Sequence, residues 1–78
     1  MSSRSELIER LADLEHKQWM NWSKNIAETE SISLERFNRW QQLWIDYNDL
    51  TEEQKEQDRV WAVHSVKIFE NWLQGMIG

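Results

Sequence analysis

Residues 3–27 read SRSELIERLADLEHKQWMNWSKNIA, without a proline or glycine. Apolar side chains recur in this stretch at intervals of three and four, which is the spacing of one face of an α-helix. The stripe consists of Leu7, Leu11, Leu14, Trp22 and Ile26, with Ile8 and Trp19 beside it. Ser3 and Glu6 fit a capping box, in which each side chain satisfies a backbone N–H of the other residue. We therefore predict a helix over residues 5–27.

A second helix is predicted over residues 33–47. The polar residues 28–32 interrupt the apolar pattern, and Ser33 is of a type that caps helices. The apolar face that follows consists of Leu34, Phe37, Trp40 and Trp44, with Leu43 and Tyr47 beside it.

A third helix is predicted over residues 51–74. Thr51 and Gln54 form another capping box at its start. Its stripe consists of Ala62, Val66, Phe69 and Leu73. Gly75 and Gly78 are the only glycines of the chain and indicate a frayed end.

These segments predict an all-α fold of one domain, residues 1–78. There is no sustained alternation of apolar and polar residues, nor an Asn-Gly or Asp-Gly turn, so strands are not expected. Three helices joined by short loops predict a small three-helix bundle, a helical hairpin plus a long third helix.

Charge and composition narrow the classes of function. The 78 residues include 14 acidic and 9 basic side chains, for a net charge of −5. Binding to a nucleic acid polymer needs a basic face, so we expect none. The absence of cysteine excludes disulfides and thiolate metal sites. Without an apolar leader or an apolar run of membrane-spanning length, we expect a soluble cytoplasmic protein, located in the host cytoplasm if it is viral.

Catalysis and metal binding have weak support in the sequence. His16 and His64 are the only histidines, and neither has the spacing of a metal-ligand motif. Glycine is confined to the last four residues, so a glycine-rich phosphate loop is not possible. There is no cysteine nucleophile and no Gly-x-Ser-x-Gly elbow. We expect no enzyme activity, no metal and no cofactor.

Two helix faces combine an aromatic ring with a polar partner. His16 and Trp19 lie three apart, so a ligand can stack on the indole while the imidazole hydrogen-bonds to it. Arg36 and Trp40 lie four apart, which lets a guanidinium cover an indole face and form one wall of a nucleobase pocket. In both cases the alternative is a purely structural contact.

A third candidate is a pair of cations on the last helix. Lys55 and Arg59 lie four apart and point the same way, as a phosphate clamp requires. The alternative is that both pair with Glu52 or Glu56 on a solvated face.

The order of these residues resembles a known family. His16-x-x-Trp19 is followed by Tyr-x-x-Leu-x-x-x-x-Lys-x-x-x-Arg, with the tyrosine at position 47 and the arginine at position 59. This pattern is similar to the repeat domain of ryanodine receptors, of which single copies occur in bacteria and phages. The resemblance covers roughly residues 7–68. The chain departs from it in lacking Gly-Trp-x-x-Gly, where residues 28–33 stand, and in having Asp46 before the tyrosine.

The resemblance implies a fold of paired helices and a nucleotide-like ligand. Receptor repeats occur in tandem pairs with approximate two-fold symmetry, so a single copy is expected to form a homodimer. Receptor repeats can also hold an adenine nucleotide, and family members have been proposed as nucleotide sensors. The ligand-binding residues are then expected to be His16, Trp19, Arg39, Trp40, Tyr47, Lys55 and Arg59.

The expected function is a non-catalytic binding module, which in a phage would sequester a host defence signalling nucleotide. The alternative is a protein-interaction or inhibitor domain, because exposed Trp and Arg often dominate interfaces. The six tryptophans divide accordingly. Trp22 and Trp44 are expected in the core, Trp19 and Trp40 at the ligand, and Trp61 and Trp72, with Met76, at a dimer or partner interface.

Overall fold

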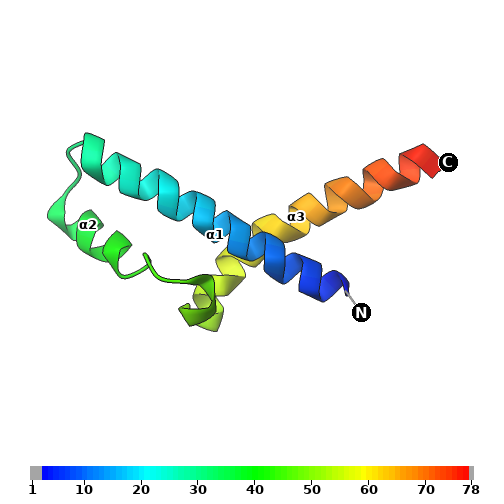
Figure 1. Ribbon diagram of the computed structural model, residues 1–78, viewed down its shortest axis with the longest axis horizontal. Coiled ribbons are helices and arrows are strands. Elements are labelled where there is room, and N and C mark those ends of the chain that lie inside the picture. The colour runs from blue at the N-terminus through cyan, green and yellow to red at the C-terminus, as the bar shows by residue number, and fades with distance from the viewer. Residues whose placement is uncertain (1–2, 78) are drawn as a thin grey trace.

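The computed structural model describes residues 3–77, which form an all-α fold as the sequence predicts. The elements are α1 (Arg4–Thr29), α2 (Leu34–Gln41), the short 3-10 helix η1 (Tyr47–Asp49) and α3 (Glu52–Ile77). Figure 1 shows that the two long helices, α1 and α3, cross, while α2 and η1 lie along one side of α1. No strand occurs among these residues.

The predicted helix starts are confirmed by capping hydrogen bonds. Ser3 accepts a bond from the Glu6 amide at 3.1 Å, although Glu6 itself accepts from Arg10 rather than completing a box. Thr51 and Gln54 form the complete box, with the Thr51 amide donating to Gln54 Oε1 at 3.0 Å and the Gln54 amide donating to Thr51 Oγ at 3.1 Å. These bonds satisfy amides that lack a partner within the helix.

The second helix is shorter than predicted, because it ends at Gln41 instead of residue 47. The chain tightens there into turns in which the Leu43 amide donates to the Trp40 carbonyl at 2.9 Å. This change of direction lets the Trp44 indole N–H donate to Ser23 Oγ at 2.9 Å. Contacts with α1 therefore override the helical periodicity of residues 42–47.

The other helix ends also differ from the prediction. α1 begins at Arg4 and continues to Thr29, two residues beyond its predicted end. α3 runs through Gly75 to Ile77, and the predicted fraying at Gly78 lies outside the described residues. A single glycine weakens a helix by about 1 kcal/mol relative to alanine but does not end it.

The fully buried positions of α1 lie off its predicted apolar stripe, although Leu11 of the stripe and Ile8 beside it pack against the core cluster. The buried residues of α1 are Ala12, His16 and Ser23. Ala12 meets Ala62 of α3 in a cluster with Tyr47 and Leu50, because small side chains let two helix backbones approach closely. The prediction that Trp22 is a core residue is wrong, since its side chain is exposed, while Trp44 is half-buried.

No helix within residues 3–77 is both long enough and apolar enough to cross a membrane.

Candidate functional site

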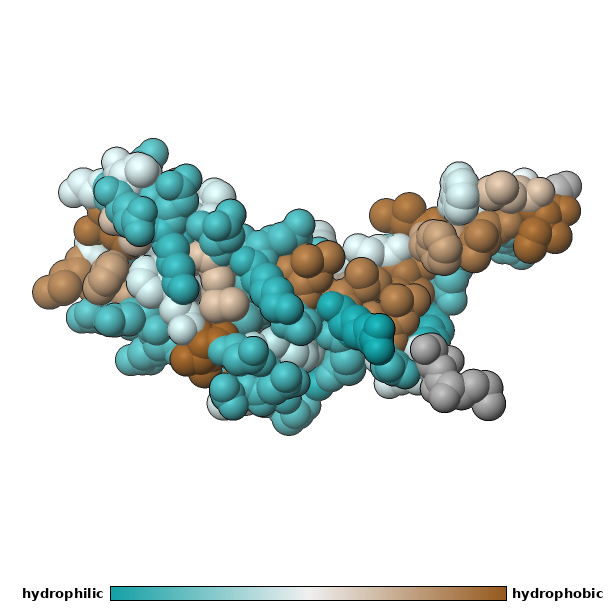
Figure 2. Space-filling model, viewed as in Figure 1, coloured by the Kyte–Doolittle hydropathy of each residue, from teal (hydrophilic) through white to brown (hydrophobic). Residues whose placement is uncertain are grey.

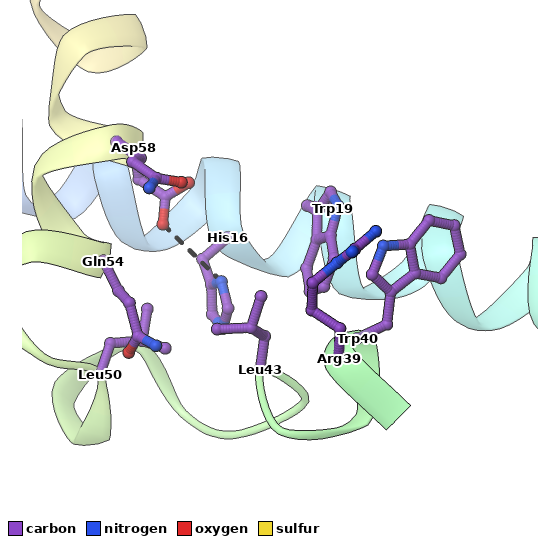
Figure 3. Close-up of a pocket in the computed structure, with 9 residues that line it drawn as sticks. His16, Trp19, Arg39, Trp40, Leu43, Leu50, Gln54 and Asp58 are labelled. Carbon is purple, nitrogen blue, oxygen red and sulfur yellow. Dashed lines mark ion pairs between the residues drawn. The ribbon is translucent and has the colours of Figure 1, made fainter. Parts of the chain in front are cut away.

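A half-open cavity of about 420 Å³ lies between the helices. Its walls come from α1, α2, the connection to η1 and the first turns of α3. The lining residues are His16, Trp19, Arg39, Trp40, Leu43, Leu50, Gln54, Gln57 and Asp58. Figure 3 shows Trp19, Arg39 and Trp40 gathered at one end, Gln54 and Asp58 at the other, and His16 between them.

The aromatic end of the cavity is a set of rings in mutual contact. The His16 and Trp19 rings are stacked, with centroids 6.0 Å apart and planes 19° apart. The Trp40 ring meets the Trp19 ring edge-on at 6.1 Å, and the Arg36 guanidinium lies 5.8 Å from the centroid of Trp40. Both indoles are half-buried. The contacts hold their orientation while part of each ring stays open to the cavity.

The polar end of the cavity is organised around His16, which is buried. Its Nε2–H donates to the carbonyl oxygen of Ile45 at 2.7 Å, and its Nδ1 lies 3.7 Å from Asp58 Oδ2. Burial raises the pKa of the Asp58 carboxyl above its usual value, the charge of His16 opposes this shift, and Glu15 adds to it. Asp58 is therefore a carboxyl group held partly out of water at the cavity wall.

The predicted cation clamp is part of an ion-pair network beside the cavity. Arg59 binds Glu9 at two points, with Nε donating to Oε2 at 2.8 Å and Nη2 donating to Oε1 at 2.7 Å. The Tyr47 hydroxyl donates to the same carboxylate at 3.0 Å. Glu52 lies 3.0 Å from Arg59 Nη1 and 3.5 Å from Lys55 Nζ. The network connects α1, η1 and α3.

The pKa values of Glu9, Tyr47 and Arg59 are shifted by their neighbours in this network. Hydrogen bonding to Arg59 lowers the pKa of Glu9 against the opposing effect of burial, and hydrogen bonding to Glu9 raises the pKa of Arg59. Burial, followed by the hydrogen bond and the charge of Glu9, raises the pKa of Tyr47 to about 12. The network thus favours an ionised carboxylate and a neutral phenol.

The seven predicted ligand residues fall into two groups. His16, Trp19, Arg39 and Trp40 line the cavity. Tyr47, Lys55 and Arg59 belong to the network around Glu9, and in the described structure they do not line the cavity.

Sequence reasoning missed the polar wall and the carboxylate at the centre of the network. Gln54 and Asp58 lie four apart on α3, which is a detectable signal for a shared face. The Gln54 carbonyl is occupied by the cap at Thr51, which leaves its amide N–H groups for the cavity. Glu9 gave no local signal, because its partner Arg59 lies 50 positions away.

The predicted interface residues Trp61, Trp72 and Met76 are all exposed on α3. No cluster of three or more His, Asp or Glu side chains suited to a metal ion occurs among residues 3–77. Comparison of the chain with protein-family models, curated proteins and solved structures found no match. The similarity to ryanodine receptor repeats therefore stays a prediction from the motif.

Proposed function

We propose that this protein is a non-catalytic binding module for a nucleotide-like small molecule held in the cavity. The observation that carries the proposal is the pairing of an aromatic wall, Trp19 and Trp40, with a wall of Gln54, Gln57 and Asp58. Indole faces stack on bases with little dependence on sequence, at about 1–3 kcal/mol per base. Amide and carboxyl groups can hydrogen-bond to the edge of the stacked base. The volume of about 420 Å³ lies within the usual range for small-molecule sites.

The charges around the cavity orient the ligand. Asp58 repels an anion, so the stacked base turns its hydrogen-bonding edge toward the polar end and the phosphate lies near Arg39. Lys55 and Arg59 are already paired with carboxylates, so Arg39 is the cation that we assign to the phosphate. One guanidinium suits one phosphate group better than a polyphosphate chain.

The resemblance to ryanodine receptor repeats supports the same ligand class, because such repeats can hold an adenine nucleotide. In a phage, a protein that binds without catalysis would sequester a signalling nucleotide of the host defence.

Titration of the purified protein with adenine nucleotides, ADP-ribose and cyclic oligonucleotides tests the proposal. Tryptophan fluorescence reports on the cavity directly, and calorimetry confirms the stoichiometry. We expect Arg39→Ala and Asp58→Asn to weaken binding by at least tenfold, about 1.4 kcal/mol. Lys17→Ala removes an exposed cation of α1 outside the cavity and should leave binding unchanged. The absence of binding tighter than roughly millimolar across the whole set would rule the proposal out.

The second candidate is a protein-interaction or inhibitor domain. The observation in its favour is the row of exposed apolar side chains on α3, which includes Trp61, Trp72 and Met76. A protein target would leave the nucleotide titration flat, whereas variants of these three residues would abolish capture of that target.

A further inference from the structure

One apolar stripe of α3 is covered in its first half and uncovered in its second. The stripe follows alternating steps of four and three residues, which is the spacing of a coiled-coil seam. Its members are Ala62, Val66, Phe69, Leu73 and Met76. Ala62 and Val66 are 0% and 2% exposed, whereas Phe69, Leu73 and Met76 are 51%, 39% and 67% exposed.

The stripe changes from buried to exposed at the level where α1 begins. Arg4, the first residue of α1, binds Glu70 through Nε at 3.1 Å and Nη2 at 3.3 Å. Beyond this ion pair α3 projects away from the rest of the fold, as Figure 1 shows. Every residue of this projecting arm, positions 67–77, is exposed, and Figure 2 shows apolar side chains along it.

The composition of the arm is that of a helix face that meets another apolar surface. Charged residues make up 29% of the chain, yet Glu70 is the only one within residues 69–77, and Arg4 pairs with it. Trp72 and Ile77 lie beside the stripe and are also exposed. Large contiguous apolar patches of this kind indicate an interaction site.

We infer that two copies of the chain pair through residues 69–77 of α3 in antiparallel orientation, with Leu73 at the two-fold axis. A second copy fits because its arm presents the same seam spacing, and a two-fold interface places identical patches together. The seam is continuous with the face that already packs on α1 at Val66, so the partner helix extends an existing helix–helix contact.

The position of α1 decides the orientation. In a parallel pair, both α1 helices would occupy the seam at the level of Val66 and hold the two α3 helices apart. In an antiparallel pair the two crossing regions lie at opposite ends of the contact. Leu73 is the midpoint of residues 69–77, so it meets its own copy, and Phe69 lies at the level of Ile77 of the second copy.

The exposed area limits the size of the interface. The exposed surfaces of Phe69, Trp72, Leu73, Met76 and Ile77 add up to on the order of 500 Å² per copy, given the size of such side chains. The pair would bury about 1,000 Å² in total, which is the lower end for a specific interface. Because interfaces of this size are typical of weak and transient complexes, we expect a reversible dimer.

Sedimentation equilibrium of the full chain tests the inference. The mass should rise with concentration from the 9.6 kDa of one chain to twice that value. Leu73→Glu should keep the mass at that of one chain. Leu34→Glu, the same change at an exposed site on α2, should dimerise normally. Circular dichroism checks that both variants remain helical. A native protein that stays at 9.6 kDa up to sub-millimolar concentration, or a dimer that Leu73→Glu does not weaken, overturns the inference.

Cysteine cross-linking tests the orientation, since the chain contains no cysteine of its own. Leu73→Cys at the axis should oxidise readily to a disulfide-linked dimer, because the bond requires Cα atoms within about 7 Å. Phe69→Cys changes the same seam one turn away: in an antiparallel pair the two substituted positions lie about 12 Å apart along the helix axis and should remain largely reduced, whereas a parallel pair would cross-link them as readily as Leu73→Cys. Equal cross-linking of the two variants would overturn the antiparallel arrangement. The comparison requires that both variants remain helical, which circular dichroism checks.

Discussion

Arg59 of α3 and Glu9 of α1 form a two-point ion pair, with N···O distances of 2.7 and 2.8 Å, across 50 positions of sequence. Two parallel hydrogen bonds fix the relative position of the groups more narrowly than a single contact does. The pair lies close to the crossing of the helices, where Ala12 and Ala62 are buried together. It therefore helps to set the geometry in which α1 and α3 meet.

Removing the carboxylate of this pair should destabilise the fold. Glu9→Gln leaves the Arg59 guanidinium without its anionic partner and weakens the hydrogen bond from Tyr47. Because both groups are partly exposed, we expect a loss of about 1–2 kcal/mol in the free energy of unfolding, measured with urea. Asp13→Asn breaks a surface pair with Lys17 and serves as control, with an expected effect below about 0.5 kcal/mol. Equal effects of the two substitutions would contradict a special role for Glu9.

The pKa of Tyr47 can be measured in isolation, because it is the only tyrosine of the chain. Ultraviolet difference absorbance of the phenolate should titrate with a pKa of about 12 instead of 10.0. Glu9→Gln should bring the pKa part of the way down, since burial, the largest cause, persists. A native protein that titrates at 10.0 while still helical would show that Tyr47 is not buried against Glu9.

The same shift makes the fold sensitive to alkali. The folded state holds the Tyr47 proton more tightly than the unfolded state, so its contribution to stability is complete below pH 10.0. This contribution should decline as the pH rises from there to about 12. Thermal melts across this range, with Tyr47→Phe as the variant that lacks the titration, measure the decline. Parallel curves for the two proteins would contradict the assignment.

Asp58 should be unfavourable for stability and favourable for ligand binding. Its raised pKa means that the ionised carboxyl is disfavoured in the folded state, mainly by burial. Stability therefore falls as the pH rises from the ordinary value of 3.8 to the pKa in the fold, and the cost is complete above it. Asp58→Asn should consequently leave the free energy of unfolding at neutral pH unchanged or slightly higher, while it weakens nucleotide binding. Functional residues often show this combination. A variant that loses stability without losing affinity would identify Asp58 as structural.

The crossing of α1 and α3 should not tolerate a larger side chain. Ala62→Leu introduces a branched side chain where Ala62 is fully buried against Ala12. Such overpacking typically costs about 1–3 kcal/mol, and here it also forces the helices apart. Ser65→Leu makes a similar change at an exposed site of the same helix and should be nearly neutral. Urea unfolding compares the two, and a neutral Ala62→Leu would contradict the close approach.

Gly75→Ala should stabilise the arm of α3. A Cβ atom at this position meets no atom within 4 Å, and alanine favours the helix over glycine by about 1 kcal/mol. We expect greater helicity by circular dichroism and, because the arm is preorganised, a tighter dimer in sedimentation. Lower helicity in this variant would indicate that the arm is not helical in solution.

Local patterns were sufficient to locate the helices and part of the cavity. The capping pairs of Ser3 with Glu6 and of Thr51 with Gln54 act within one turn, so their residue types indicate where a helix begins. His16 and Trp19 share a face because they lie three apart, and their rings are stacked in the structure. In each case the interacting groups are separated by a distance that the helix itself determines.

The tertiary structure decided what these helices pack against. Ala12 is buried at the crossing while Trp22 is exposed, because the approach of two helix backbones favours small side chains that carry little hydrophobic signal. Ser23 is buried where the Trp44 indole donates to it. The helix predicted to reach residue 47 stops at Gln41, where contacts to Ser23 outweigh the local periodicity. Arg59, expected at a phosphate, binds Glu9 instead, since which carboxylate a long side chain meets depends on how α1 and α3 cross. Spacing along one helix specifies its own neighbours, but the partner across the crossing is chosen only when two distant segments fold together.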